Sequence, residues 1–320
     1  MAPESFGRFF LRGDGGRLRG QQWGTGLGTA IVFLHGGGQN RHAWAEPARS
    51  LAARGFTTLT VDQRGHGASD RTRESRYTHE DMADDVVRVC AALPRPPVLV
   101  GSSMGGIVSL IAEGERGPGI CQGIVLVDVA PQVNLDGLSR VHAFFGRSAP
   151  GFVSAEEAHA VLSEYAVHRK PSLRSTIRNL EMGPDGRWYW HWDPLFAATV
   201  GDFHDQSRMT AALSAVTVPV LMLRGERSDI VPASTLDELP RINPNITVAE
   251  VAGAGHMITA EHNGVFAAAL ESFVVSLASN TGRPSSNLRN THEPLRRRDV
   301  PRHAQPRRDS GDPSRGQGDL

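Results

Sequence analysis

The sequence has only two cysteines, Cys90 and Cys121, and their spacing is typical of neither a metal site nor a redox site. Both lie in apolar segments, so we expect them to be free and buried. No apolar run approaches the roughly eighteen residues that a membrane span needs. The first residues show no basic region followed by an apolar stretch. These absences predict a soluble, cytoplasmic protein that holds no metal and has no membrane partner.

The chain also has no net charge, because its 34 basic residues balance its 34 acidic residues. This balance argues against binding nucleic acid through the overall field of the protein. The exception is the segment 281–320, which is rich in Arg and Pro and poor in large apolar residues. We expect this tail to be disordered, since it cannot offset its ordering entropy by burial. Its arginines are typical either of a solvated extension or of an anionic docking site.

Short apolar runs alternate with helix-like segments through the first 130 residues. This alternation predicts an α/β fold with a mostly parallel central sheet and helices on both faces. Two apolar stretches between Phe6 and Trp23 flank a glycine-rich turn and predict an antiparallel hairpin at the sheet edge. The expected strands are Ile31–Leu34, Thr57–Val61, Val98–Gly101 and Ile124–Val127, and the expected helices are Trp44–Arg54, Glu80–Leu93 and Met104–Gly114.

The alternation stops after Asp128 and resumes near Val216. The residues between are mainly helical in pattern and predict a cap inserted at about 132–214 into one domain that spans 1–280. A cap in this place would cover the carboxyl edge of the sheet.

The stretch Gly101-Ser102-Ser103-Met104-Gly105 lies between an expected strand and an expected helix. A serine on such a sharp turn is raised above the sheet, and the flanking glycines remove Cβ atoms that would collide there. Ser103 is therefore the candidate nucleophile.

A serine nucleophile needs a base, and the base needs an acid to orient it. His256 follows an apolar run and comes directly after the glycine-rich stretch Gly253-Ala254-Gly255, which permits a tight loop. Asp229 follows the apolar run Val218–Leu223 and is the predicted acid. Asp128, at the end of an earlier strand, is the alternative acid.

Together these motifs resemble the α/β-hydrolase superfamily over roughly residues 5–278, including His35-Gly36-Gly37-Gly38 and Asp62–Ser69. The chain order Ser103, Asp229, His256 is the order of the triad on that fold. The resemblance implies an oxyanion hole made by the N–H groups of Gly37 and Met104, and no cofactor. The charged residues of Asp62–Gly67 are interpreted as structural.

The resemblance implies a serine hydrolase that cleaves an ester, thioester or lactone of a partly apolar small molecule. The alternatives are a carbon–carbon bond hydrolase, a cofactor-free haloperoxidase or perhydrolase, and a non-catalytic ligand receptor. An aromatic-rich segment of the cap contains Trp190, His191 and Trp192. These three residues are candidates for substrate binding, or else they attach the cap to the body. The sequence does not determine the oligomeric state.

Overall fold

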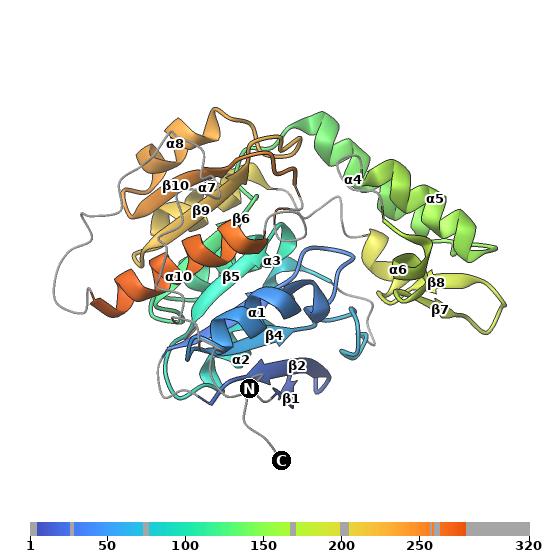
Figure 1. The fold of residues 1–320 in the computed structure, drawn as a ribbon, viewed down its shortest axis with the longest axis horizontal. Helices are drawn as coiled ribbons and strands as arrows, with labels where there is room; N and C mark the ends of the chain where they lie inside the picture. Colours follow the sequence, from blue (N-terminus) through green and yellow to red (C-terminus); the bar gives the residue numbers. More distant parts are fainter. Residues whose placement is uncertain are drawn as a thin grey trace, which may run out of the picture.

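The computed structural model describes residues 5–25, 29–72, 77–166, 171–198, 205–256, 258 and 263–279 (Figure 1). The segment 281–320, for which the sequence predicts disorder, lies outside the described residues.

An eight-stranded sheet forms the centre of the molecule, with strand order β1-β2-β4-β3-β5-β6-β9-β10. The first two strands pair antiparallel, which confirms the predicted edge hairpin, and β3, β4, β5, β6, β9 and β10 pair in parallel. The strands are β1 Ser5–Leu11, β2 Arg17–Trp23, β3 Ala30–Leu34, β4 Thr57–Val61, β5 Val98–Ser102, β6 Gly123–Val127, β9 Val220–Gly225 and β10 Ile246–Val251.

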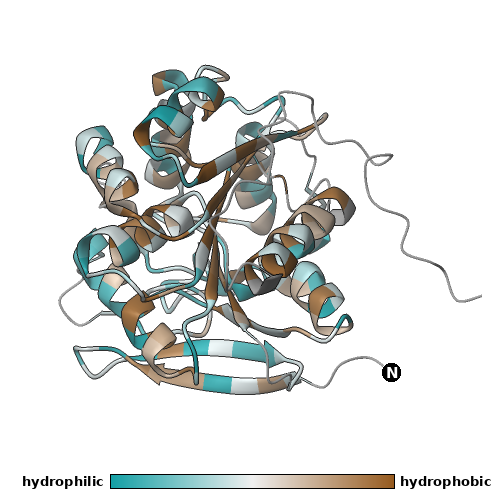
Figure 2. Ribbon diagram, turned by 90° about the vertical axis from the view of Figure 1, so that its left-hand side faces the viewer, coloured by the Kyte–Doolittle hydropathy of each residue, from teal (hydrophilic) through white to brown (hydrophobic). Residues whose placement is uncertain are grey.

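Helices cover both faces of this sheet, which explains why its central strands are continuous apolar runs. In β3, Ile31 and Phe33 pack into one apolar cluster, while Val32 and Leu34 pack into another. Figure 2 shows the apolar strands between the two helical layers. Helices α1 (Ala45–Ala52) and α10 (Asn263–Ser279) cover one face, and the other is covered by α2 (His79–Ala91), α3 (Met104–Glu115), α7 (Gln206–Ala215) and α8 (Thr235–Ile242).

The segment 132–198, called the insertion below, leaves the sheet after β6 and lies at one end of the molecule (Figure 1). Its elements are α4 Leu135–Ser148, α5 Ala155–Tyr165, α6 Leu173–Ile177, β7 Leu180–Met182, β8 Trp188–Trp190 and the 3-10 helix η2 Pro194–Ala198. A mainly helical pattern was expected, but β7 and β8 form a hairpin around the Gly183–Gly186 turn. Helix α7 packs closely against α3 of the body. If Gly114 of α3 were alanine, its Cβ would meet the carbonyl of Ala212 in α7.

Both cysteines are free and buried, as predicted. Among the described helices, none combines the length and the apolar content that crossing a bilayer requires.

Candidate active site

Ser103 stands on a strained turn between β5 and α3. Its φ of 46° and ψ of −118° lie in a region that non-glycine residues rarely adopt. Such strain persists only where the surrounding structure enforces it, and here strand and helix approach closely. A Cβ on Gly101 would lie 2.3 Å from the carbonyl carbon of Gly105. The hydroxyl of Ser103 makes no hydrogen bond within the described part of the chain.

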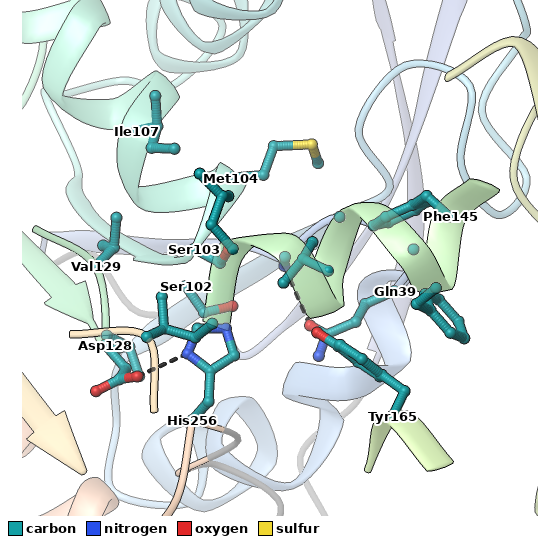
Figure 3. Close-up of a pocket in the computed structure, with 18 of the residues that line it drawn as sticks. Gln39, Ser102, Ser103, Met104, Ile107, Asp128, Val129, Phe145, Tyr165 and His256 are labelled. Carbon is teal, nitrogen blue, oxygen red and sulfur yellow. Dashed lines mark hydrogen bonds and ion pairs between the residues drawn. The ribbon is translucent and has the colours of Figure 1, made fainter. Parts of the chain in front are cut away.

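Asp128 and His256 form a hydrogen-bonded pair beside this serine, and His256 is the partly exposed member of the pair. The His256 Nδ1–H donates to Asp128 Oδ2 at 2.6 Å, and the Asp128 side chain is fully buried. Asp128 also has a positive φ, 49°, at the end of β6, the strand adjacent to β5. Figure 3 shows His256 between Asp128 and the serines Ser102 and Ser103. The remaining ring nitrogen, Nε2, is thus left for the serine side of the site.

Two further donors hold the carboxylate of Asp128. The Gly225 N–H donates to Oδ1 at 3.0 Å, and the Ser228 hydroxyl donates to Oδ2 at 2.6 Å. Ser228 is held in turn by the N–H groups of Ile230 and Val231. A buried carboxylate needs such partners to offset the loss of hydration. These two donors therefore fix the orientation in which the Asp128 carboxylate meets the imidazole.

Asp229, the acid predicted from the sequence, does not contact His256. Its carboxylate pairs with the guanidinium of Arg140 on α4 and is 31% exposed. The prediction of Asp229 as the partner of the histidine is wrong, because Ser228 fills the position on this loop that faces the site. The alternative, Asp128, is the residue that the structure places on His256.

The turn after β3 holds the predicted oxyanion donor Gly37. Three N–H groups around it are already bound: Gly36 donates to Gln39 Oε1, Gly38 to His66 Nε2, and Gln39 to the Gly36 carbonyl, each at 3.1 Å. Within the described residues, no acceptor takes the N–H of Gly37 or that of Met104, the first residue of α3. A Cβ on Gly36 would lie 3.5 Å from Ser103 Cβ, so this turn borders the serine.

A cavity of about 180 Å³ opens over Ser103, His256 and the Gly36–Gln39 turn (Figure 3). The insertion contributes apolar and aromatic side chains to its wall: Val133, Leu138, Val141, Phe144, Phe145, Leu162, Tyr165 and Phe196. The body contributes Met104, Ile107, Val127, Val129, Ile230 and Ile258. Burial raises the pKa of Tyr165 to about 12, so its hydroxyl keeps its proton at neutral pH.

Trp190, His191 and Trp192, predicted to bind substrate, do not line this cavity. Trp190 donates from Nε1 to Ser148 Oγ at 3.1 Å, and the Trp192 ring packs on Phe145 with centroids 5.1 Å apart. His191 Nδ1 accepts from the Gly67 N–H at 3.3 Å. These contacts favour the other interpretation, attachment of the insertion to the body, and a role of the three residues in substrate binding stays a prediction.

The aromatic residues that do line the cavity were not singled out from the sequence. A signal was present in α4, where Leu138, Val141 and Phe145 recur at helical spacing and so share one face. That face opposes the body rather than solvent only because α4 lies over the sheet edge, which periodicity alone cannot show.

The charged side chains of Asp62–Gly67 form ion pairs away from the cavity, in agreement with the structural interpretation. Asp62 is fully buried and pairs with Arg41, and Arg64 pairs with Asp85 with Nε–Oδ2 at 2.6 Å. Within the described ranges, no group of three metal-ligating side chains is placed to hold an ion.

Residues 29–263 match the model of the family described as alpha/beta hydrolase fold. This chain belongs to that family. It is 29% identical over 270 residues to a 2-(acetamidomethylene)succinate hydrolase of Mesorhizobium japonicum, covering 82% of this chain and 94% of that protein. It is also 29% identical over 238 residues to an esterase of Mycobacterium tuberculosis, covering 72% of this chain and 76% of the esterase.

A crystal structure of E-2-(acetamidomethylene)succinate hydrolase superposes on this alpha/beta hydrolase with a TM-score of 0.74 at 26% sequence identity, covering 85% of this chain and all of that one. A non-haem chloroperoxidase of Kitasatospora aureofaciens is 26% identical to this chain over 268 residues. That alignment covers 77% of this chain and 90% of the chloroperoxidase. The alpha/beta hydrolase family and fold expected from the motifs are thus confirmed, and the relatives include a hydrolase of a substituted succinate, an esterase and a chloroperoxidase.

Proposed function

We propose that this protein is a serine hydrolase that cleaves carboxylic esters of partly apolar small molecules through an acyl-enzyme. The observation that carries the proposal is the serine on a strained turn, beside a histidine–carboxylate pair and two N–H groups that no acceptor among the described residues takes. Ser103 is the proposed nucleophile, His256 the base and Asp128 the acid that orients the base. Gly37 and Met104 are the proposed oxyanion donors.

In the first half-reaction, Ser103 Oγ bonds to the ester carbonyl carbon while its proton passes to His256 Nε2. The carbonyl oxygen becomes an oxyanion, which the N–H groups of Gly37 and Met104 stabilise. Each such donor is worth about 3 to 4 kcal/mol of barrier. The alcohol leaves with the proton from His256. Water then gives a proton to His256 and attacks the acyl carbon. His256 returns that proton to Ser103 Oγ as the bond from the acyl carbon to Oγ breaks and the acid is released.

The base and nucleophile must approach for this transfer, since Ser103 forms no hydrogen bond in the described structure. Hydrogen bonds of this kind are often long without substrate and tighten in the complex. The fixed Nδ1–H bond to Asp128 leaves rotation of the serine hydroxyl as the smaller adjustment.

The cavity wall favours a neutral substrate. Among its described lining residues, the titratable side chains are Asp128, His256 and Tyr165, and none is Arg or Lys. A substrate with two carboxylates, like that named for the succinate hydrolase relative, needs cationic partners to offset desolvation. The apolar wall instead suits an alkyl or aryl acyl group. A nitrophenyl butyrate should therefore be hydrolysed in preference to the matching nitrophenyl hemisuccinate.

The proposal is tested by intact-mass measurement after treatment with a fluorophosphonate. We expect one adduct on the wild type and none on Ser103→Ala, because only an activated serine attacks this reagent. Ser102→Ala, one residue away, is the matched control and should keep the adduct. A folded wild type that gives no adduct would contradict the proposal and favour a ligand receptor.

The bond cleaved is tested separately by steady-state turnover of a nitrophenyl ester, an acyl thioester and a ring-fission diketone. Ester or thioester turnover that exceeds diketone turnover supports the proposal. Preferred cleavage of the diketone would identify a carbon–carbon bond hydrolase on the same serine.

The dependence of activity on pH follows from the environment of His256. Burial alone would lower its pKa, but the hydrogen bond that His256 donates to Asp128 and the charges of Asp128 and Asp229 outweigh burial and raise the pKa above 6.5. The neutral imidazole is the base, so kcat/KM should rise with pH through an apparent pKa above 6.5 and then level off. A stopped assay from pH 5 to 9 measures this, and a midpoint below 6 would contradict the assignment.

A further inference from the structure

We propose that His66 is a positioning residue of the oxyanion hole. It acts as a neutral imidazole that binds the N–H of Gly38 and thereby leaves the neighbouring N–H of Gly37 to the substrate. This inference rests on the proposed function, because it concerns how the donor turn of that reaction is held.

His66 lies in the loop after β4, the strand that pairs with β3, and its side chain is fully buried. Its Nε2 accepts from the Gly38 N–H at 3.1 Å, and its Nδ1 lies 3.0 Å from the Arg64 carbonyl oxygen. Both ring nitrogens are therefore used. The ring is also packed between two others, His35 at 5.1 Å and Phe196 at 4.7 Å between centroids.

The partners determine where the proton lies. The Gly38 N–H can only donate, so Nε2 must present a lone pair, and the Arg64 carbonyl can only accept, so Nδ1 must carry the hydrogen. A second proton on Nε2 would face the Gly38 N–H. Burial, reinforced by the neighbouring His35, lowers the pKa of His66 well below 6.5, so the neutral form persists.

The hydrogen bond from Gly38 to His66 determines which N–H group of the turn is available to the substrate. Gly38 has a φ of 74°, a backbone conformation that glycine adopts readily, and in it the Gly38 N–H donates to His66. Without an acceptor there, the partly buried N–H of Gly38 would lose its hydrogen bond. The turn would then relax to satisfy Gly38, and the Gly37 N–H would leave its position beside Ser103.

The same loop also holds the insertion. The Asp193 N–H donates to the Gly65 carbonyl at 2.7 Å, and the Gly67 N–H donates to His191 at 3.3 Å. Phe196, which packs edge-on against the His66 ring, lines the cavity. His66 thus contacts the donor turn on one side and the cavity wall on the other, so ring packing must be separated from hydrogen bonding in any test.

Two substitutions separate the effect of ring packing from that of hydrogen bonding. His66→Phe keeps a ring against Phe196 but removes the acceptor, whereas His66→Gln loses the ring but offers Oε1 to the Gly38 N–H. We expect His66→Phe to lower kcat by about 30-fold with KM within about twofold, since an oxyanion donor is displaced rather than removed. The inhibition constant of an aryl trifluoromethyl ketone, which forms an oxyanion on Ser103, should rise by the same factor. His66→Gln should recover most of both losses.

The opposite order, with His66→Phe active and His66→Gln impaired, would overturn the proposal and assign His66 to packing. A rise in KM with kcat unchanged in His66→Phe would overturn it as well. Circular dichroism and thermal unfolding establish that both variants are folded.

A measurement on the wild type needs no turnover and separates failure here from failure of the proposed function. Long-range ¹H–¹⁵N correlation spectra of the histidines should show His66 protonated on Nδ1 alone at pH 7. An Nε2–H tautomer or an imidazolium would overturn the inference even if esters are hydrolysed. A wild type with the Nδ1–H tautomer but without ester turnover or fluorophosphonate adduct would contradict the proposed function only.

Discussion

Replacement of Asp128 by asparagine is expected to lower kcat by about four orders of magnitude, whereas Asp229→Asn should leave kcat within about threefold of the wild type. The Asp128 carboxylate accepts the Nδ1–H of His256, and in the proposed mechanism it stabilises the imidazolium that forms during attack. An amide in its place can donate toward Nδ1, which favours the tautomer with its proton on the wrong nitrogen. Asp229 instead pairs with Arg140 on the insertion.

Steady-state kinetics of both variants from pH 5 to 9 measure the difference. Asp229 still contributes a charge that raises the pKa of His256, so Asp229→Asn should move the midpoint of the profile to lower pH. Equal losses of kcat in the two variants would contradict the assignment of Asp128. A loss confined to Asp229→Asn would restore the order predicted from the sequence.

Gly105→Ala is expected to reduce the free energy of unfolding by at least about 3 kcal/mol. A Cβ at this position would lie 2.2 Å from the Leu34 carbonyl oxygen and 2.9 Å from that of His35. Both are backbone atoms, in β3 and in the turn after it, and cannot move aside as a flexible side chain would. Helix α3 would have to move away from the sheet and carry Ser103 with it.

Urea unfolding followed by circular dichroism measures this loss, and Gly146→Ala provides the matched control. Gly146 lies within α4, and a Cβ there would meet no atom within 4 Å. Alanine should therefore stabilise this helix by up to about 1 kcal/mol. A Gly105→Ala protein as stable as the wild type would show that strand and helix are not packed as closely as the structure places them.

The sequence predicted the parts of the site that depend on local chain geometry. A buried strand followed by Gly101–Gly105 has few conformations available, because strand, sharp turn and helix are adjacent in the chain. The same holds for the Gly36–Gly38 turn after β3. The strands themselves were predictable because burial on both faces leaves continuous apolar runs.

The choice between two aspartates could not be made in this way. Asp128 and Asp229 both follow strands of the parallel sheet, so both reach the edge where His256 lies. The difference arises from the positive φ of Asp128 and from Ser228, one residue before Asp229, which donates to the Asp128 carboxylate. These are contacts between segments far apart in the chain, and no local pattern encodes them.

The insertion was the least predictable part for a related reason. Trp188–Trp190 forms a strand of a short hairpin, and the tryptophans pack behind the phenylalanines that line the cavity. Aromatic composition alone does not distinguish the tryptophans from the phenylalanines that line the cavity. Which layer meets the cavity depends on the position of α4 over the sheet edge.

With Asp128 as the acid, nucleophile and acid both lie in one β–α–β unit, formed by β5, α3 and β6. The insertion begins just after this unit and contributes neither residue, whereas the loop after β9 supplies the supporting hydroxyl of Ser228 and the cavity-wall residue Ile230. Changes of length or sequence in the insertion can therefore alter the chamber above the serine without displacing the Asp128–His256 pair beneath it. This division of the chain would allow one reaction centre to be combined with differently shaped chambers, both during divergence of the family and by transplantation of the insertion in the laboratory.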